Sequence, residues 1–525
     1  MSAFTSPAEF DDAYTTLFRT FASGRTKDLA WRKWQLKQVW WMFDENEAAI
    51  LAALKSDLNR GEFESYLSDV RGIREDVIRA LKNIDKWAAD DIPDAGFIFG
   101  TLSGARIKKE PLGVALIIGA WNFPVLLIIK PMIAAIAAGC CAMLKPSELS
   151  HATQNLLAEL VPKYLDPSAI RVVTGGPHET QEILKRRFNH IFFTGSNKIA
   201  KFVTEAAAKH LTPTVLELGG QGPAVVTAKA NVDLAAKRIA YVKYMNAGQI
   251  CLSVNHVFVD PSVHDEFVER LGFWFNTFIA EKPGNMVRIV NERNWDRLTG
   301  LLDRSNGKLV HGGKKDRDIK YLEPTIVTDI GYDDSLFSEE LFGPICPIIK
   351  ADYKTAYRKI ASMEHPLALY IFSLDNKEVE EIIAHTNSGG VTVNDVLLHI
   401  MVPNAPFGGV GDSGHGYYHG KYGFDEFTHL RTVVSPPMFL EKLFVLGMRY
   451  PPFKRSNISK MVVKNSLGFK KGETLEDQRK RPLVPAWSRK AAGMVAMVAV
   501  MLAVMDKTKV PLGYLAKLKN LVGLN

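Results

Sequence analysis

The stretch HIFFTGSNKIAKFVTEAAAKHLTPTVLELGG, residues 190–220, decides the fold class. A short apolar run is followed by apolar positions at helical spacing and then by a second apolar run, which predicts a strand, a helix and a strand. Thr194, Gly195 and Ser196 fall where the first strand meets the helix. A glycine permits a tight turn there and the helix N-terminus can hold a phosphate, although such turns are also common without a ligand.

The same alternation continues upstream of this stretch. Short apolar runs predict strands at VALIIG (114–119), CAMLK (141–145) and RVVTG (171–175), with helices near 130–139, 151–163 and 177–187. Strands and helices that alternate in this way form a parallel sheet covered on both faces. We therefore predict an α/β fold whose first lobe is doubly wound and resembles nucleotide-binding domains.

A second alternating series follows and predicts a second α/β lobe. Its strands are expected at AVVT (224–227), VFVD (257–260), YIFS (370–373) and GGVTVN (389–394), with a helix at 233–246. Two segments, 97–113 and 426–440, fit neither lobe and are interpreted as strands of an arm, whereas 8–92 has helical spacing. The predicted domains are 1–217, which is the dinucleotide-binding lobe, 218–425, which is the catalytic lobe, 426–450, an oligomerisation arm, 451–490, a basic linker, and 491–525, a tail.

Charge is distributed unevenly along the 525 residues. Residues 451–525 hold 15 Lys and Arg against 4 Asp and Glu, whereas residues 1–450 hold 50 against 53. The body is therefore nearly neutral, which argues against a nucleic-acid-binding face. Four cysteines without a CxxC pair predict no disulfide scaffold and favour a reducing compartment. The N-terminus lacks the apolar segment of a secretory signal.

The C-terminal tail contains AAGMVAMVAVMLAVM, residues 491–505, which has no charged side chain. Fifteen residues in a helix span about 22 Å, whereas a full crossing of a bilayer needs about 20 residues. We expect a helix that associates with a membrane, by tilted insertion or by lying on the surface, aided by the basic linker. A buried helix that closes a dimer is the alternative.

Three side chains at predicted strand ends or turns could carry chemistry. Cys251, in GQIC, follows a helix and precedes a strand, where a thiolate can attack an aldehyde carbon, although a lone cysteine is often only a core residue. Glu217, at the end of TVLE, can act as a general base or form a structural ion pair. Asn122, in GAWNFP, can donate to an oxyanion or occupy a turn.

Three histidines, His399, His415 and His419, lie close together in the sequence. They lack the spacing of metal ligands, so we predict no metal site.

Together these pieces match a known family. Over about residues 10–445 the chain resembles the aldehyde dehydrogenase superfamily through GAWNFP (119–124), LKPSE (144–148), FFTGS (192–196), LELGG (216–220), GQIC (248–251), EELFGP (339–344) and PFGGVGDSG (406–414). The strings NDVLLH (394–399) and PFGGVGDSGHGYYHGK (406–421) resemble the class 3, fatty-aldehyde branch. Two departures are Ala200 in place of a second glycine and Gln221 in place of a lysine that many relatives carry.

The resemblance implies a role for each matched residue. Cys251 corresponds to the nucleophile, Asn122 to the oxyanion donor and Glu217 to the base that activates water. Glu340 corresponds to the glutamate that holds the nicotinamide ribose and can share the base role. The other implied cofactor contacts are Lys145 and Glu148 at the adenosine ribose, Thr194, Gly195 and Ser196 near the pyrophosphate, and Phe342 beside the nicotinamide.

The implied activity is oxidation of an aldehyde to its acid through a thiohemiacetal and a thioester on Cys251. NAD is the expected cofactor because Glu148 would repel a 2′-phosphate, with NADP as the alternative. The tail favours long-chain fatty aldehydes, and apocarotenoid or isoprenoid aldehydes are the nearest rivals. Glu217 disfavours a CoA-acylating relative, and a catalytically silent membrane-surface scaffold is the distant alternative.

The resemblance also implies where and how the protein works. We expect a homodimer attached to an intracellular membrane such as the endoplasmic reticulum, with the catalytic part facing the cytosol.

Overall fold

The computed structural model describes residues 4–281, 286–438, 449–461 and 471–480, in two units that span 1–436 and 437–525. The second unit shows short helical segments where a linker was predicted, namely η8 (Arg455–Asn457), α18 (Ile458–Met461) and α19 (Leu475–Lys480). The predicted tail, 491–525, lies outside the described residues. Within the described ranges, no helix is both long enough and apolar enough to cross a membrane.

The first sheet of the large unit is doubly wound, as predicted. Its strand order is β16-β6-β5-β2-β3-β4, and its bounds are β2 (Val114–Ile118), β3 (Cys141–Lys145), β4 (Ile170–Val172), β5 (His190–Thr194), β6 (Thr214–Glu217) and β16 (Gly414–His415). The chain runs outward from β2 through β3 and β4, then continues on the other side of β2 with β5 and β6. The carboxyl ends of β2 and β5 therefore flank the point where the strand order reverses, which is where such sheets bind ligands.

The strand β16 was not predicted in this sheet, because residues 414–415 were assigned to the second lobe. It pairs antiparallel with β6, and Gly414 lies opposite Glu217. Gly414 has a φ of 120°, and a Cβ there would overlap the carbonyl oxygen of Leu216. Only glycine lets the backbone approach β6 so closely, so the distant segment closes the edge of the first sheet.

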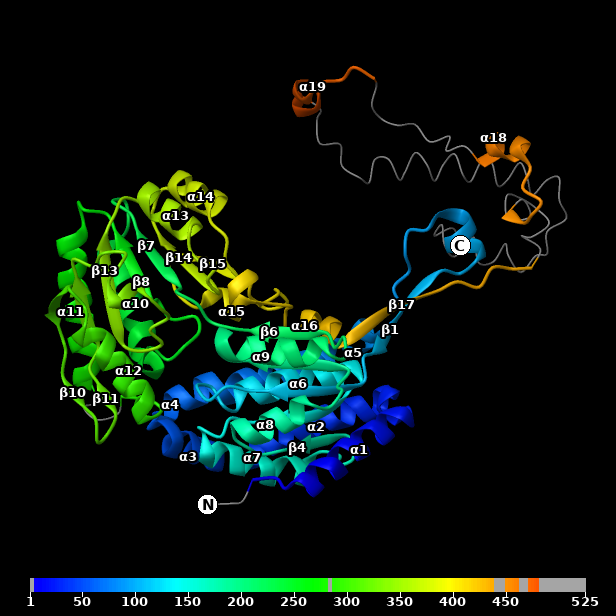
Figure 1. Ribbon diagram of the computed structural model, residues 1–525, viewed down its shortest axis with the longest axis horizontal. Helices are drawn as coiled ribbons and strands as arrows, with labels where there is room; N and C mark the ends of the chain where they lie inside the picture. Colours follow the sequence, from blue (N-terminus) through cyan, green and yellow to red (C-terminus); the bar gives the residue numbers. More distant parts are fainter. Residues whose placement is uncertain (1–3, 282–285, 439–448, 462–470, 481–525) are drawn as a thin grey trace. The chain divides into compact units, whose positions relative to one another are not determined.

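Helices cover this first sheet. The expected helical N-terminal region comprises α1 (Pro7–Ala22), α2 (Leu29–Glu45), α3 (Glu47–Leu58), α4 (Glu62–Ser65), the π-helical η2 (Tyr66–Arg71) and α5 (Gly72–Ala88). The helices that connect the successive strands β2 to β6 are α6 (Leu126–Ala138), α7 (His151–Tyr164), α8 (Pro177–Leu184) and α9 (Asn197–Ala208). In Figure 1, α6 and α9 lie beside the strands that they connect, and α6 packs against β2 and β3.

The second sheet has seven strands in the order β15-β14-β7-β8-β13-β12-β9. The predicted strands are β7 (Pro223–Val226), β8 (His256–Val259), β14 (Ala368–Phe372) and β15 (Gly390–Val393), and the unpredicted ones are β9 (Lys308–His311), β12 (Thr325–Thr328) and β13 (Ile345–Lys350). Only β9 runs antiparallel. The helices are α10 (Val232–Tyr244), α11 (His264–Glu281), α12 (Glu292–Asp303), α13 (Tyr353–Ala361) and α14 (Asn376–His385) (Figure 1).

The predicted arm is a two-stranded antiparallel ribbon of β1 (Arg106–Pro111) and β17 (Thr428–Val433). The arm strand was expected to begin near residue 97, but Gly96–Leu102 forms the helical segment η3. Gly104, with a φ of 56°, separates this segment from the extended backbone, so β1 begins only at Arg106.

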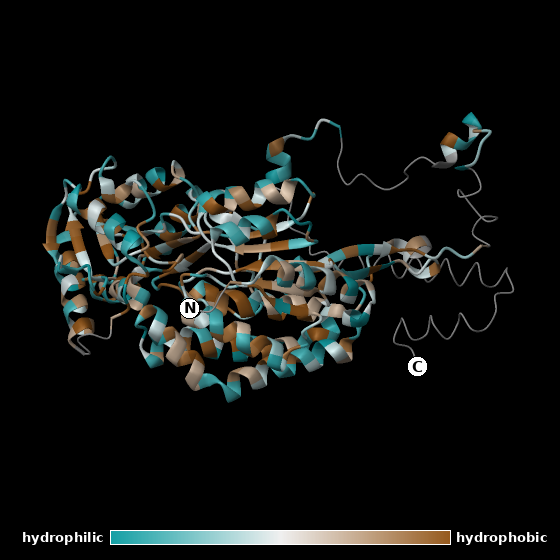
Figure 2. Ribbon diagram, turned by 60° about the horizontal axis from the view of Figure 1, so that its bottom comes forward, coloured by the Kyte–Doolittle hydropathy of each residue, from teal (hydrophilic) through white to brown (hydrophobic). Residues whose placement is uncertain are grey.

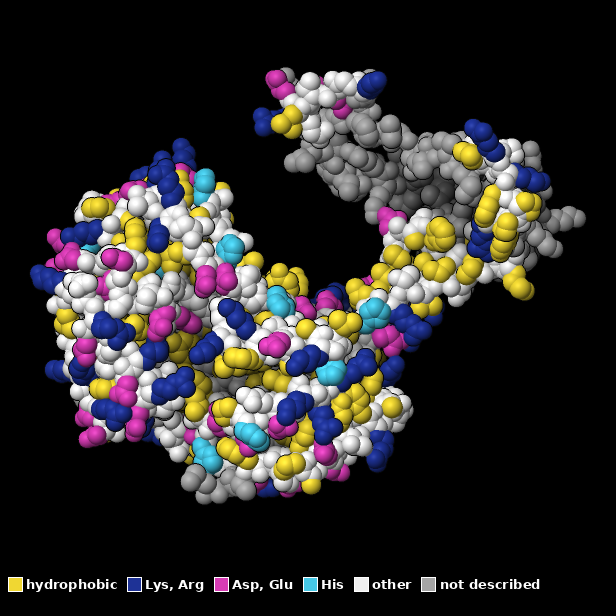
Figure 3. Space-filling model, in the orientation of Figure 1, with side chains coloured by type: hydrophobic (Ala, Val, Ile, Leu, Met, Phe, Trp, Pro, Cys, Tyr) yellow, Lys and Arg dark blue, Asp and Glu magenta, His cyan; other side chains and the backbone are white. Residues whose placement is uncertain are grey.

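Hydropathy follows this architecture. The strands of both sheets are largely hydrophobic, whereas hydrophilic residues gather on the outward faces of the helices (Figure 2). Every residue of β2, β3 and β5 is buried. On the face drawn in Figure 3, basic and acidic side chains alternate over the large unit without a continuous patch of one sign. The burial pattern explains why these strands read as continuous apolar runs.

Candidate active site

Cys251 lies in the turn that the sequence predicts, between α10 and β8. The chain leaves α10 through η4 (Met245–Gly248), where Asn246 and Ala247 have φ values of 50° and 53°. Gly248 is also left-handed, and a Cβ there would overlap the carbonyl oxygen of Gly343. These backbone conformations turn the chain sharply before Cys251, which is half-buried, whereas the other three cysteines are buried.

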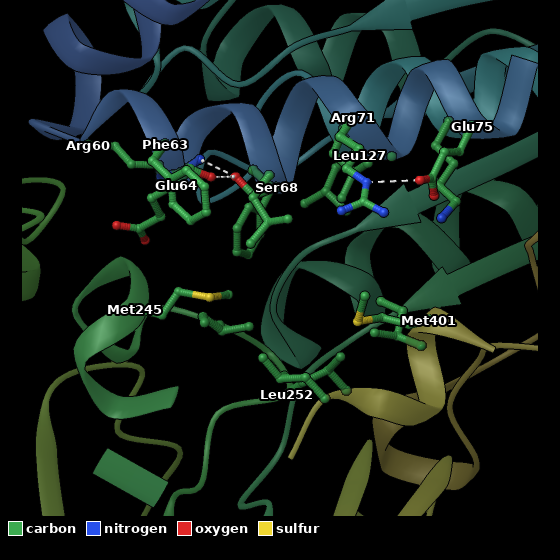
Figure 4. Close-up of a pocket in the computed structure, with 18 of the residues that line it drawn as sticks. Arg60, Phe63, Glu64, Ser68, Arg71, Glu75, Leu127, Met245, Leu252 and Met401 are labelled. Atoms are coloured by element: carbon green, nitrogen blue, oxygen red, sulfur yellow. Dashed lines mark hydrogen bonds and ion pairs between the residues drawn. The ribbon is translucent and has the colours of Figure 1, made fainter. Parts of the chain in front are cut away.

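A cavity of about 1090 Å³ is lined in part by Cys251. Figure 4 shows one wall with Phe63, Ser68, Arg71, Glu75 and Leu127, which faces Met245, Leu252 and Met401 across the cavity. Most of the other lining side chains are apolar or aromatic, among them Leu51, Leu126, Tyr241, Tyr244, Ile250, Phe278, Ile400, Val402 and Phe407. The wall therefore suits an apolar molecule whose reactive end reaches the thiol.

Several of the charged side chains that line this cavity form ion pairs with each other. Arg71 pairs with Glu75 at 2.9 Å, and Asp76 pairs with Arg79 at 3.0 Å and with Lys130 at 3.1 Å. Arg79 and Lys130 thus share Asp76, and these ion pairs reduce the net charge on this part of the wall.

Glu217 occupies the last position of β6, as predicted. It is 4% exposed, and neither of its carboxylate oxygens has a hydrogen-bond partner in the protein. Burial, with a contribution from Glu426, raises the pKa of this carboxyl well above its usual range. A buried carboxyl without a partner is costly for the fold, so its presence favours a chemical role.

Glu340 is the second predicted glutamate near the thiol. Its carboxylate packs against Gly219, where a side chain would overlap it, and accepts a backbone hydrogen bond from Gly220. Desolvation raises the pKa of Glu340 to about 7. Burial and the two carboxylates, Glu340 and then Glu217, raise the pKa of the Cys251 thiol to about 12. The structure thus brings both predicted glutamates within electrostatic reach of the predicted nucleophile.

Asn122 follows β2 and is buried. Its Nδ2 donates to the carbonyl oxygen of Gln249 at 3.1 Å, two residues before Cys251. A primary amide has a second N–H, which can serve a developing negative charge. The structure therefore brings the predicted oxyanion donor beside the cysteine turn.

The predicted cofactor residues gather at the carboxyl ends of β3 and β5. Lys145, the last residue of β3, forms a 2.8 Å ion pair with Glu148. Ser196 precedes α9 without capping it through its side chain, and the buried Thr194 hydroxyl has no partner. Unpaired donors at the N-terminus of a long helix fit a dinucleotide phosphate.

Gly195 and Phe342 are the other two predicted cofactor contacts. Gly195 was expected to supply a tight turn, but its φ is not left-handed; instead a Cβ there would lie 2.5 Å from the Phe193 ring. Phe342 packs edge-on against Trp121, with ring centroids 5.4 Å apart. Trp121 precedes Asn122, so this ring contact brings Phe342 close to the loop that carries Asn122.

The histidines do not form a metal site. His399 contacts the hydroxyl of Thr392 at 2.8 Å, His415 contacts that of Thr214 at 2.7 Å, and His419 stacks on Phe407. In the described ranges, no group of three or more potential metal ligands comes together.

Sequence reasoning missed several residues near the site. Arg60 and Asn246 hydrogen bond behind Asn122, and Tyr418 lines the cavity beside Cys251. Arg60 lies in a polar string, SDLNRGEFES, that carried no signal beyond an ordinary exposed turn. Its burial depends on the fold of three distant segments and could not be found from spacing.

The fold and this arrangement define a class of oxidoreductase in which a cysteine works beside a dinucleotide site. The sequence profile described as "Aldehyde dehydrogenase family" matches residues 7–433. The chain belongs to that family and is an aldehyde dehydrogenase that uses NAD or NADP.

The similar proteins include members of family 3. The chain is 43% identical over 436 residues, covering 82% of it and 95% of the relative, to "Aldehyde dehydrogenase, dimeric NADP-preferring" of Rattus norvegicus. It is 42% identical over 447 residues, 84% and 91% of the two chains, to "Aldehyde dehydrogenase family 3 member A2" of the same organism. It is 41% identical over 450 residues, 85% and 84% of the two chains, to "Beta-apo-4'-carotenal oxygenase" of Neurospora crassa.

A solved structure supports the fold over the same region. "Substrate bound state of Staphylococcus Aureus AldH" superposes with a TM-score of 0.82 at 34% identity, covering 86% of this chain and 99% of that one. The resemblance noted from the motifs is therefore confirmed.

Proposed function

We propose that this aldehyde dehydrogenase oxidises long-chain apolar aldehydes to carboxylic acids through a covalent intermediate on Cys251. The observation that carries the proposal is the largely apolar cavity of about 1090 Å³ that Cys251 helps to line. A cavity of this size holds a drug-sized molecule, so it is far larger than a two-carbon aldehyde needs.

The first step is attack of the Cys251 sulfur on the aldehyde carbon. The thiol pKa is raised to about 12, so the proton must pass to a neighbouring base as the bond forms. Glu217 and Glu340 are the bases within reach, and their raised pKa values make them better proton acceptors than ordinary carboxylates. The product of this step is a thiohemiacetal.

The oxygen of the thiohemiacetal bears negative charge as it forms. The free N–H of the Asn122 amide and the backbone N–H of Cys251 are the proposed donors to this oxygen. Such donors stabilise the transition state because they are already oriented before the charge appears.

Bound NAD(P) supplies the hydride acceptor that lets the thiohemiacetal become a thioester. The residues that would hold it are Thr194, Gly195 and Ser196 at the pyrophosphate, Lys145 and Glu148 at the adenosine ribose, and Glu340 and Phe342 at the nicotinamide riboside. Because Glu148 is already paired with Lys145, its repulsion of a 2′-phosphate is reduced, which supports use of NADP as well as NAD.

Glu217 completes the cycle. As the carboxylate it takes a proton from water, the hydroxide attacks the thioester carbon, and the Cys251 thiolate leaves with the acid released. The unpaired oxygens of Glu217 support this role, since no protein donor competes for them.

The test is a series of straight-chain aldehydes of rising length with the full chain. Each additional buried CH₂ is worth about 0.8 kcal/mol, so kcat/KM should rise up to about fourfold per carbon until the cavity is filled. Met401→Glu, on the exposed cavity wall, should lower kcat/KM for long aldehydes but not for propanal. Leu374→Glu, at an exposed position outside the cavity, is the matched control. A flat length dependence would sink the substrate assignment.

Apocarotenoid aldehydes are the second candidate substrate. The observation that favours them is the 41% identity to the Neurospora crassa protein named as a carotenal oxygenase. An apocarotenal with a higher kcat/KM than any saturated aldehyde would make this the better assignment.

We also propose that the protein is a homodimer and associates with an intracellular membrane, such as the endoplasmic reticulum, with its catalytic part toward the cytosol. The dimer is supported by the printed name of a relative, and membrane association by the uncharged run 491–505 beside a basic segment. Flotation with vesicles that contain anionic lipid tests the second point. Recovery of the Met497→Asp/Val500→Asp variant with the vesicles, equal to that of the unchanged chain, would refute it.

A further inference from the structure

A completely buried arginine lies behind the proposed oxyanion donor. Arg60, in the turn between α3 and α4, has a side chain with no exposed surface, and so does its partner Asp69 in η2. Their Nη1 and Oδ2 atoms are 2.6 Å apart. A buried charge is tolerated only with such a partner, so this pair is neutral as a unit and is costly to break.

The remaining nitrogens of Arg60 reach both loops of the site. Nη2 donates to the backbone carbonyl of Asn122 and, at 2.7 Å, to Oδ1 of Asn246. Nε donates to the same Oδ1 at 3.2 Å. One rigid guanidinium therefore links the loop after β2 to the loop before Cys251.

Asn246 extends this link to the cysteine turn. Its Nδ2 donates to the carbonyl oxygens of Asn122 at 3.1 Å and of Gln249 at 3.0 Å. The Asn122 side chain donates to the same Gln249 carbonyl. The backbone and the side chain of Asn122 are thus both fixed to the segment that ends at Cys251.

The other carboxylate oxygen of Asp69 secures the far side of the Asn122 loop. Oδ1 accepts the backbone N–H groups of Val125 at 3.2 Å and Leu126 at 2.9 Å, at the start of α6. The loop that carries Asn122 is therefore held by Arg60 from behind and by Asp69 at its end.

The cysteine loop needs this support because its backbone is unfavourable. Asn246 and Ala247 are both left-handed, which L residues rarely adopt. Glu64 Oε1 accepts the backbone N–H of Asn246 at 2.6 Å, and Arg60 holds the side chain of the same residue. Figure 4 shows Arg60 and Glu64 together on one cavity wall, opposite Met245.

We propose that Arg60 is a positioning residue for the oxyanion hole: through Asn246 it fixes the distance between the Asn122 amide and the backbone N–H of Cys251. This inference rests on the roles proposed for Asn122 and Cys251. Arg60 does not touch the substrate carbonyl in this scheme, and it acts on catalysis only through the placement of the Asn122 amide relative to the Cys251 N–H.

The test is a double-mutant cycle on Cys251-dependent hydrolysis of 4-nitrophenyl acetate, which needs neither an aldehyde nor a cofactor. Removing one oxyanion donor typically costs about 10²–10³-fold in kcat. Arg60→Met should therefore lower kcat about 10–100-fold with little change in KM. The Arg60→Met/Asn122→Ala double variant should fall within about threefold of Asn122→Ala alone, because both changes disable the same donor.

Arg32→Met is the matched control. Arg32 is also a buried arginine, but it donates to the carbonyls of Thr26, Lys27 and Ala137. This change should lower thermal stability as well, yet leave kcat of the folded protein within about twofold and leave the effect of Asn122→Ala undiminished. The comparison separates a general loss of stability from loss of positioning.

Asn246→Gly is the second variant in case Arg60→Met does not fold. It keeps a left-handed backbone and the Arg60–Asp69 pair while removing the link, and we expect about a tenfold loss of kcat that does not multiply with Asn122→Ala. Losses that multiply for both Arg60→Met and Asn246→Gly would overturn the positioning role. If Asn122→Ala alone had no effect, the oxyanion assignment of the proposed function would fail, and the role of Arg60 with it.

Discussion

The two walls beside Cys251 differ in how many of their polar side chains have a partner. On the helical wall, formed by α3 to α6, several charged side chains form ion pairs, such as Arg71 with Glu75 and Lys130 with Asp76. On the wall formed by the strand ends, the hydroxyl of Thr194 and both carboxylate oxygens of Glu217 are buried without partners. Polar side chains that pair with each other leave no free polar group on the surface, whereas buried polar groups without a partner are available to a ligand or a reaction. We therefore assign the helical wall to binding of the apolar substrate and the strand ends to the groups that react.

The largest expected effect is at the thiol where the two walls meet. Cys251→Ala should lower kcat/KM for aldehyde oxidation on the order of 10⁴-fold or more, since the nucleophile of a covalent mechanism is lost. Cys346→Ala, which removes a buried thiol from β13, should leave kcat/KM within about twofold. The measurement is NADH formation with saturating cofactor. Activity that survives in Cys251→Ala would contradict the mechanism.

Next in size is the loss of the unpaired carboxylate on the strand-end wall. Glu217→Gln should lower steady-state kcat about 10²–10³-fold, within the range for loss of a general base. Glu340 can still accept the thiol proton, so the first turnover should persist. A rapid-mixing experiment should then show a burst of NADH close to one equivalent per site, followed by a slow phase. Loss of the burst would instead place Glu217 before hydride transfer.

The same substitution should change stability in a pH-dependent way. Burial raises the folded-state pKa of Glu217 above the 4.5 of an exposed glutamate. Below pH 4.5 the carboxyl is protonated in both states and contributes no penalty. As pH rises from 4.5 through the folded pKa, the Glu217 carboxyl ionises in the unfolded state before it ionises in the folded state. The free energy of unfolding therefore falls over this range. Glu217→Gln should therefore raise Tm at pH 8 and leave it nearly unchanged at pH 4; an equal shift at both values would contradict the burial argument.

The smallest effect is expected on the helical wall. The Arg71 and Glu75 side chains are 55% and 52% exposed, so their ion pair contributes less than about 1 kcal/mol. Arg71→Ala should change Tm by a degree or two at most and kcat/KM for a long aldehyde by less than threefold. Thermal melts and the same aldehyde assay check both. A tenfold loss would mean that this wall binds a charged substrate group.

The fold was predictable where burial leaves a local pattern. In the first sheet β2, β3 and β5 are buried throughout and were found as apolar runs, and Cys251, Glu217 and Asn122 were placed correctly at a turn or at strand ends. In the second sheet β9, β12 and β13 were missed: β9 is an exposed edge strand, β12 is only four residues long, and β13 contains Pro347. A pattern in the sequence reports periodicity, not which distant segments will pair.

Within the site, only the residues that belong to the sequence motifs could be predicted. Arg60 and Asp69 look like surface residues in the sequence, and their burial follows from three segments that meet only in the folded chain. The same holds for β16, whose glycine gives no local hint that it will lie against Glu217.

That last pairing has a consequence for how the protein is made. Glu217 precedes Gly414 by about two hundred residues, so that stretch must be synthesised before β16 can pair with β6 at Glu217. The first sheet is therefore completed by a strand that the chain reaches only after it has passed through the second lobe. A chain that ended before residue 414 would lack the strand that pairs with Glu217.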